Sequence, residues 1–179
     1  MSDATVILGP DAGYEALDAR AAAEGFVRAA SQMRLHERAR AVQWERAGAR
    51  VSYIEDHLRG VRYLYGEAGA VARIADGFER VTREALEADA SGGEVRAALA
   101  ALQGLCVLDG SSPGPVLAAR LEALSRHDEL AVRRAVLRMM AFGAGRAMLD
   151  VVKRAARVEV DATLRAQWRA LAKAIGDAN

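Results

Sequence analysis

Apolar residues recur along most of this chain at intervals close to 3.6 residues, which is the period of an α-helix. Between residues 14 and 50 the spaced apolar positions are Leu17, Ala21, Phe26, Ala30, Met33, Leu35, Ala39 and Val42. One long helix or a helical hairpin broken near Ser31 would both produce this spacing. The pattern therefore predicts a helical segment over residues 14–50.

Further helices are predicted between clusters of glycine, serine and proline, which interrupt regular structure. The longest interruption is the run Asp-Gly-Ser-Ser-Pro-Gly-Pro at residues 109–115. A strand-like pattern occurs only in short pieces such as residues 5–8. We predict helices over residues 52–65, 70–88, 94–105, 115–125, 128–142, 146–157 and 161–175. The sequence thus predicts an all-α fold.

Three of these predicted helices begin with a repeated pattern, an aliphatic residue followed by arginine. Each aliphatic residue has bulky apolar residues four and seven positions later. The pairs are Val95-Arg96, Val132-Arg133 and Leu164-Arg165. A second predicted helix lies between consecutive copies, so the repeated unit is helix, turn, helix. Such units bury their apolar faces by stacking on one another, which makes one continuous core.

This unit resembles the HEAT-like helical repeat, in which an aliphatic-arginine pair near the start of the first helix follows a short polar corner. Residues 125–129, Ser-Arg-His-Asp-Glu, form such a corner before Val132. The resemblance covers roughly residues 56–176 and implies a short α-solenoid of stacked helical hairpins. The first 50 residues show no matching unit. An irregular compact helical bundle is the alternative fold.

The predicted organisation is a single domain in three parts. Residues 1–13 form a flexible N-terminus, residues 14–50 the N-terminal helical segment, and residues 51–179 the helical repeats. The N-terminal helical segment would cap the first repeat or mediate self-association, because the apolar face at each end of a stack needs a cover.

The composition narrows the classes of function. The 179 residues carry 25 Lys and Arg against 24 Asp and Glu, a formal net charge of +1, which excludes a strongly basic or strongly acidic protein. Nearly all cations are arginine, and with the frequent alanine and valine this is typical of a GC-rich bacterial genome. No signal peptide or membrane-spanning run is predicted, and the single cysteine, Cys106, cannot form an internal disulfide. We therefore expect a cytoplasmic protein.

No residue pattern indicates a catalytic, cofactor-binding or metal-binding site. The pairs His36-Glu37 and Asp56-His57 lack the convergent set of three or four ligands that a metal ion needs. Cys106 lies in an apolar run and suits buried packing. The glycine runs at residues 9–13 and 143–145 lack the Gly-Lys-Ser/Thr ending of a phosphate-binding loop. The sequence therefore predicts a protein that is not an enzyme and has no cofactor or metal.

Arginines and tyrosines supply the candidate interaction residues. Stacked helical pairs align equivalent positions along one face, so the arginines of the later helices are expected to form a basic stripe. Acidic residues close in sequence, including Glu122 and Glu159, would neutralise part of its charge. Tyr63 and Tyr65 would point about 200° apart on one helix, which leaves one of them exposed as an interface anchor. The candidates are Tyr63, Tyr65, Arg133, Arg134, Arg138, Arg154, Arg165 and Arg169.

These observations favour a non-enzymatic adaptor or scaffold subunit of a bacterial cytoplasmic complex, which binds another protein through its stacked helices. The alternative is an accessory subunit of a nucleoprotein complex that contacts nucleic acid through the arginine stripe. Binding to nucleic acid would weaken steeply with salt, whereas binding to a protein would not need to. A membrane is not an expected partner.

Overall fold

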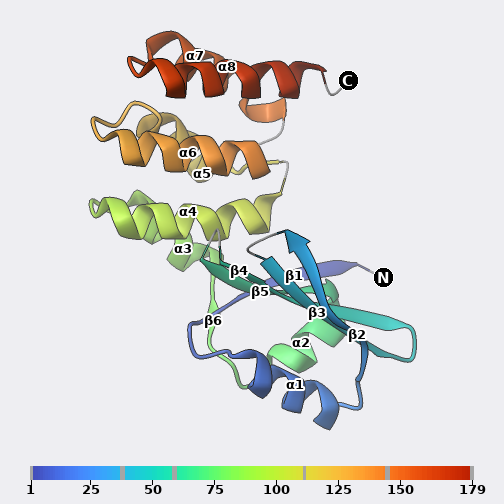
Figure 1. Cartoon of the computed structure of the whole chain (residues 1–179). Helices are drawn as coiled ribbons and strands as arrows, with labels where there is room; N and C mark the ends of the chain where they lie inside the picture. Colours follow the sequence, from blue (N-terminus) through green and yellow to red (C-terminus); the bar gives the residue numbers. More distant parts are fainter. Residues whose placement is uncertain (1, 37–38, 58–59, 111, 144–145, 178–179) are drawn as a thin grey trace. The chain divides into compact units, whose positions relative to one another are not determined.

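The computed structural model divides the chain into two compact units, residues 1–82 and 83–179 (Figure 1). Each unit has its own buried core and is described by itself. The residues that the structure describes are 2–36, 39–57, 60–110, 112–143 and 146–177.

Within its described residues, the first unit folds as one antiparallel sheet with strand order β2-β3-β4-β5-β1-β6. Helix α1 (Tyr14–Ala23) connects β1 to β2, and helix α2 (Ala68–Ala75) follows β5. The strands are β1 (Asp3–Leu8), β2 (Val27–His36), β3 (Ala39–Arg46), β4 (Ala49–Asp56), β5 (Val61–Glu67) and β6 (Arg80–Val81).

The hairpin of β3 and β4 shows why this region forms strands. Ala47 and Gly48 both have positive φ angles, 49° and 84°, and they form the two-residue turn that joins the strands. A turn of this kind matches the twist of the flanking strands. Val42 then lies opposite Tyr53, and alternate side chains along both strands reach the core.

The core of the first unit lies between the sheet and its two helices, which cover the same face (Figure 1). Leu17 of α1 and Ile74 of α2 are fully buried against Trp44 and Leu64 of the sheet. The indole Nε1 of Trp44 also donates a hydrogen bond to Asp18 Oδ1 at 2.8 Å, which ties α1 to β3. Apolar burial therefore positions both helices on the sheet.

The second unit, within its described residues, consists of helical hairpins packed in layers (Figure 1). Its helices are α3 (Arg83–Ser91), α4 (Val95–Asp109), α5 (Pro115–Leu124), α6 (Leu130–Gly143), α7 (Leu149–Val158) and α8 (Ala162–Asp177), with the 3-10 turn η1 (Arg146–Met148) before α7. Pro115 occupies the first turn of α5, where a backbone N–H would have no partner within the helix and proline lacks none that is needed. Among the described residues, no helix is both long enough and apolar enough to cross a membrane.

The prediction of an all-α fold is wrong, and so is a helical solenoid or helical bundle for the whole chain. The predicted helical segment over residues 14–50 is helical only as far as Ala23, and β2, β3 and the start of β4 follow it. The predicted helix over residues 52–65 lies in β4 and β5, and part of the expected flexible N-terminus is β1. Alanine and arginine favour helix locally, but pairing with neighbouring strands and burial of one face of the sheet override that preference here.

The aliphatic-arginine pairs occupy similar places in two of their three copies. Val132 and Leu164 are buried, and the arginine after each donates a hydrogen bond to a backbone carbonyl six residues earlier. These bonds measure 2.7 Å from Arg133 to His127 and 3.1 Å from Arg165 to Glu159. In the first copy Val95 is half-buried and its arginine is exposed. The repeated arginine therefore anchors the turn before its own helix in the second and third copies.

Candidate interaction surface

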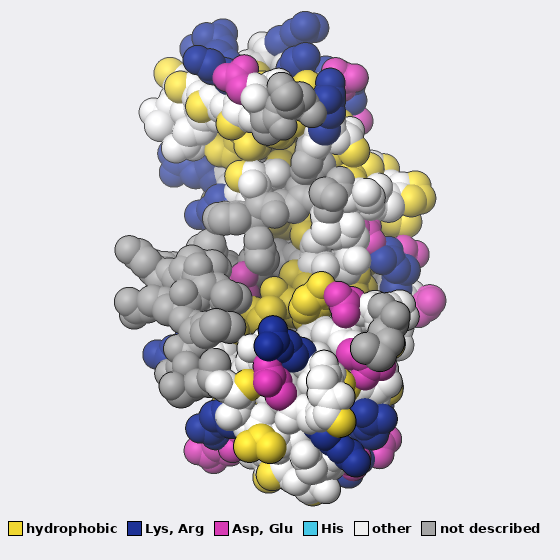
Figure 2. Space-filling model, turned by 90° about the vertical axis from the view of Figure 1, so that its right-hand side faces the viewer, with side chains coloured by type: hydrophobic (Ala, Val, Ile, Leu, Met, Phe, Trp, Pro, Cys, Tyr) yellow, Lys and Arg dark blue, Asp and Glu magenta, His cyan; other side chains and the backbone are white. Residues whose placement is uncertain are grey.

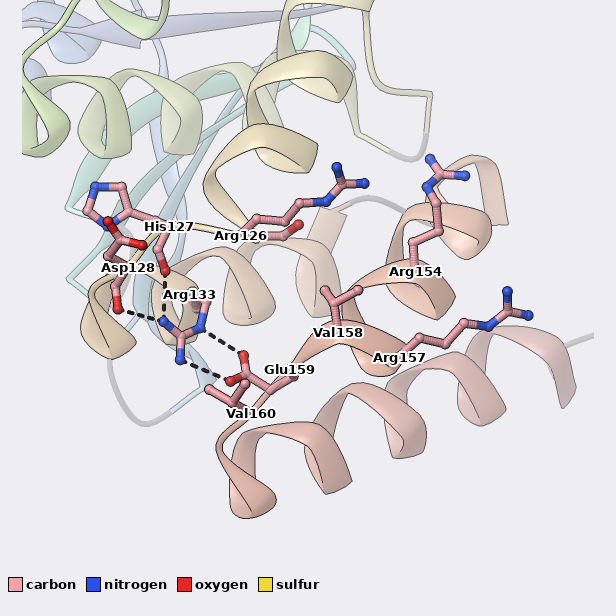
Figure 3. A pocket seen from close by; sticks show the side chains of 10 residues that line it. Arg126, His127, Asp128, Arg133, Arg154, Arg157, Val158, Glu159 and Val160 are labelled. Atoms are coloured by element: carbon pink, nitrogen blue, oxygen red, sulfur yellow. Dashed lines mark hydrogen bonds and ion pairs between the residues drawn. The ribbon is translucent and has the colours of Figure 1, made fainter.

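A groove of about 620 Å³ opens on the second unit between the α5–α6 turn and the α7–α8 corner (Figure 3). The turn contributes polar residues, the end of α7 contributes arginines, and the corner contributes two valines. The lining residues are Ser125, Arg126, His127, Asp128, Arg133, Arg154, Arg157, Val158, Glu159 and Val160.

A buried ion pair holds the two sides of this groove together. Arg133 Nε and Nη2 donate to the two carboxylate oxygens of Glu159, both at 2.9 Å. The side chains are 11% and 1% exposed. Arg133 Nη1 also donates to the carbonyls of His127 and Asp128, at 2.7 and 2.8 Å, and Glu159 accepts from the backbone N–H of Asp161. One guanidinium thus links α6, the α5–α6 turn and the α7–α8 corner.

The pair is charged but offers no net charge to a ligand. The hydrogen bond from Arg133 lowers the pKa of Glu159 and outweighs burial, which acts in the opposite direction. The same bond raises the pKa of Arg133. Both groups are therefore ionised at neutral pH and neutralise each other, so attraction for a charged ligand has to come from other residues of the groove.

Burial of Glu159 turns the valines on either side of it toward solvent. Glu159 caps the C-terminal end of α7 with an extended backbone, φ −64° and ψ 126°. Successive side chains of an extended backbone point to opposite sides. Val158 and Val160 are accordingly 57% and 82% exposed, while Glu159 faces inward. The same ion pair that stabilises the corner presents two aliphatic side chains at the groove.

Three arginines extend toward one end of the groove, and His127 and Asp128 lie at the other end (Figure 3). Arg126 Nη2 and Arg154 Nη2 both lie 3.0 Å from the same oxygen, Oε1 of Glu122. Arg157 is exposed beside them. The arginine end therefore has two cations on one carboxylate and a third exposed cation, Arg157.

The region around the groove has an excess of positive charge. Residues 120–177 hold twelve Lys and Arg against seven Asp and Glu, an excess of five, whereas the whole chain has an excess of one. In the face shown in Figure 2, Lys and Arg side chains gather over α7 and α8. This part of the second unit therefore has a positive net charge, unlike the rest of the chain.

The predicted arginine stripe does not form a single site. Arg154 lines the groove, but Arg133 is buried in its ion pair and Arg165 is half-buried with its Nη1 on a backbone carbonyl. The other three predicted arginines are exposed and do not line the groove: Arg134, Arg138 and Arg169. Similar sequence positions therefore differ in role, because burial next to Glu159 turns one arginine into a structural cation.

Tyr63 and Tyr65 lie on strand β5, so the expectation that they point to opposite sides is wrong. Residues two apart on a strand share one face of the sheet. Tyr65 is 46% exposed, and its hydroxyl donates to Asp3 Oδ2 at 2.9 Å, a bond that raises the pKa of Tyr65. Tyr63 is half-buried. The pair marks the face of the sheet that α1 and α2 leave uncovered.

A second groove, of about 510 Å³, lies on this face of the first unit. Its lining residues are Asp3, Gln43, Glu45, Gly48, Arg50, Ser52, Tyr65, Gly66 and Glu67. The carboxylates among them are already bound within the unit: Asp3 by Tyr65, Glu45 by Arg50, and Glu67 by the first N–H groups of α2. Within the described residues, the lining of this groove contains no aliphatic side chain, whereas that of the groove of the second unit contains two valines.

Within the part of the chain that the structure describes, no three His, Cys, Asp or Glu side chains are grouped to hold a metal ion. Cys106 is buried in α4. Of the sequence features considered for chemistry, Glu37 and residues 144–145 lie outside the described residues.

Comparison of the chain with protein-family models, with curated proteins and with solved structures gives no match. The resemblance to HEAT-like repeats therefore stays a prediction. Sequence reasoning also missed four residues of the groove as interaction residues, namely Arg126, Arg157, Val158 and Val160. The available signal was the sequence Val-Glu-Val at a corner between two helices, where apolar side chains have no helical face to join.

Proposed function

We propose that this chain is a non-enzymatic protein-binding adaptor, and that the groove of its second unit holds a segment of the partner protein. The observation that carries the proposal is the exposure of Val158 and Val160, at 57% and 82%, beside a concave surface with three exposed arginines. Single exposed aliphatic residues are common on protein surfaces. Two of them at a groove, held outward by a buried ion pair, suit contact with a partner's apolar side chains.

The groove suits a protein segment better than a nucleic acid. Proteins that bind single strands stack bases on aromatic side chains, and the groove lining contains no Phe, Tyr or Trp. Its valines can instead bury aliphatic side chains of a peptide, which a phosphate backbone does not offer.

The second candidate function is an accessory subunit that contacts nucleic acid. The excess of five positive charges over residues 120–177 favours it, because phosphate contacts depend on local basic charge rather than on the charge of the whole chain. Retention on a nucleic-acid column that falls steeply with salt would support this function. Retention of a protein partner that changes little with salt would support the adaptor.

We propose the cytoplasm as the compartment. The single cysteine, Cys106, is buried as a thiol and packs in α4, which suits a reducing environment.

Photo-cross-linking in the native cells tests the adaptor function. The substitution Val160→p-benzoylphenylalanine places the cross-linker at the groove, and the same substitution at Lys173, which is exposed on α8, places it elsewhere on the second unit. We expect a defined protein to cross-link from position 160 and not from position 173. Absence of a cross-linked protein at position 160, or the same products at both positions, would refute the proposal.

A further inference from the structure

Glu122 is an internal carboxylate that binds two arginines of the groove lining, although it is not itself a lining residue. Its Oε1 accepts from Arg154 Nε at 3.0 Å and from Arg126 Nη2 at 3.0 Å, so one oxygen is shared by two guanidiniums. The Glu122 side chain is 34% exposed, and those of Arg126 and Arg154 are 52% and 46% exposed. Exposed ion pairs of this kind contribute little to stability and exchange readily with other partners.

The two ends of the groove differ in charge. The cations Arg126, Arg154 and Arg157 extend to one end, the exposed Val158 lies between, and Asp128 lies at the opposite end (Figure 3). A segment bound along it would meet positive charge on one side of its apolar contact and negative charge on the other. Charge complementarity therefore favours a ligand with acidic residues on one side of an aliphatic residue.

We propose that the groove binds an acidic peptide segment of a partner protein, in which an aliphatic side chain contacts Val158 and Val160 and a carboxylate takes the place of Glu122 between Arg126 and Arg154. This inference rests on the proposed adaptor function and specifies the chemistry of its partner. Glu122 then acts as an internal competitor. It keeps the two arginines paired in the free protein, and it weakens the affinity for the peptide because the ligand has to displace it.

Binding of defined peptides to the full-length protein, followed by fluorescence anisotropy, tests the inference. The first probe is a labelled peptide in which a pair of leucines precedes a run of glutamates. The second has glutamines in place of the glutamates, the third has serines in place of the leucines, and the fourth probe is a labelled single-stranded oligonucleotide. We expect the first probe to bind at least about tenfold more tightly than the second and third.

Variants of the groove test the role of Glu122. E122Q is expected to tighten binding of the first peptide by about three- to tenfold, because the arginines lose their internal partner. The double variant R154Q/R157Q is expected to weaken it by about tenfold or more. Matched controls make the same charge changes at exposed positions outside the groove lining, D150N for E122Q and R138Q/R169Q for R154Q/R157Q. Each control should stay within about twofold of the wild type. Thermal unfolding of every variant checks that the fold is retained.

Three results would overturn the inference: equal binding of the glutamate and glutamine peptides, no gain in affinity from E122Q beyond that from D150N, or tighter binding of the oligonucleotide than of the peptide. If position 160 still cross-links a protein in cells, the adaptor function survives such a result and only the acidic ligand is wrong. If position 160 captures no protein, the adaptor function fails as well.

Discussion

At the scale of single residues, the arginines of this chain divide into structural and exposed groups according to burial. The guanidinium of Arg133 is bound by Glu159 and by two backbone carbonyls, so its positive charge is neutralised inside the fold. Arg154 and Arg157 are exposed to solvent. A count of arginines on predicted helices therefore overstates the charge that a ligand meets.

The Arg133–Glu159 pair gives a prediction about acid stability. The folded-state pKa of Glu159 lies below its ordinary value of 4.5, so the pair's contribution to stability is full above that pH and is lost as the pH falls below it. E159Q should lower the free energy of unfolding at pH 7 by about 3–5 kcal/mol, because Arg133 is left without its buried partner. E159Q should also remove the contribution of Glu159 to the fall in unfolding free energy at acid pH. Urea unfolding at several pH values measures both effects.

E122Q is the matched control for E159Q, since it makes the same change in an exposed ion pair. Its effect on the free energy of unfolding should be at most about 1 kcal/mol. Equal pH dependence of unfolding in E159Q and the wild type would contradict the structural role of the pair.

Gly66 gives a second prediction at this scale. It has a φ of +148° within β5, and a Cβ added there would lie 2.1 Å from the carbonyl oxygen of Arg50 on β4. Gly66→Ala should therefore force these strands apart and lower the free energy of unfolding by at least about 2 kcal/mol. Gly13→Ala in the same unit, where an added methyl group meets nothing within 4 Å, should change it by less than about 1 kcal/mol. Far-UV circular dichroism during urea unfolding compares the two variants.

At the scale of elements, the sequence predicted the later helices well and the strands poorly. The predicted helices over residues 94–105 and 115–125 correspond to α4 and α5 within a few residues, because their apolar spacing and their flanking glycines and prolines are local signals. The predicted helix over residues 70–88 is instead α2, β6 and α3. The spacing cannot mark such a break, since apolar residues on both sides of it keep a helical period.

The packing of α8 carries the third prediction. Trp168 is fully buried, so Trp168→Ala should cost about 3–5 kcal/mol of unfolding free energy. Within the described residues, Trp168 Nε1 has no hydrogen-bond partner, so Trp168→Phe should cost less than half as much. Gln167→Ala, at the exposed neighbouring position, should be nearly neutral. Similar losses for the two Trp168 variants would mean that the indole nitrogen does contribute a hydrogen bond.

At the scale of the whole molecule, the chain consists of two units that differ in kind. Among the described residues, the first contains a sheet covered by two helices, and the second contains helices with one short 3-10 turn. The basic charge is concentrated over residues 120–177, while the remainder of the chain has thirteen Lys and Arg against seventeen Asp and Glu. A net charge near zero therefore conceals a strongly uneven distribution.

The second unit should fold when expressed alone as residues 83–179, because it has its own core. The fully buried side chains of that core include Leu102, Leu105, Leu117, Leu121, Met140, Leu164 and Trp168. We expect a helical circular dichroism spectrum and a cooperative thermal transition for this fragment. A spectrum of unfolded chain would show that the unit depends on residues 1–82.

The candidate groove could be predicted only in part. Arg154 was identified from sequence as a candidate, but nothing in the sequence separated it from Arg133, which is buried. The exposure of Val158 and Val160 depends on Glu159 turning inward to meet an arginine that lies 26 residues away along the chain. This ion pair forms only when α6 and α7 pack together, so a local sequence pattern cannot predict it.

Local signals in the sequence were enough to predict helices α4 to α8, the turns between them and the absence of an internal disulfide, because helical hydrogen bonds and turn preferences act between residues close in the chain. Tertiary structure decided the sheet and the groove. A strand bonds to other strands and not within itself, as β1 does to β5 about sixty residues later, and segments such as residues 39–56 fit a helical period as well as an alternating one. Which period is realised depends on the burial that the assembled sheet and helices provide.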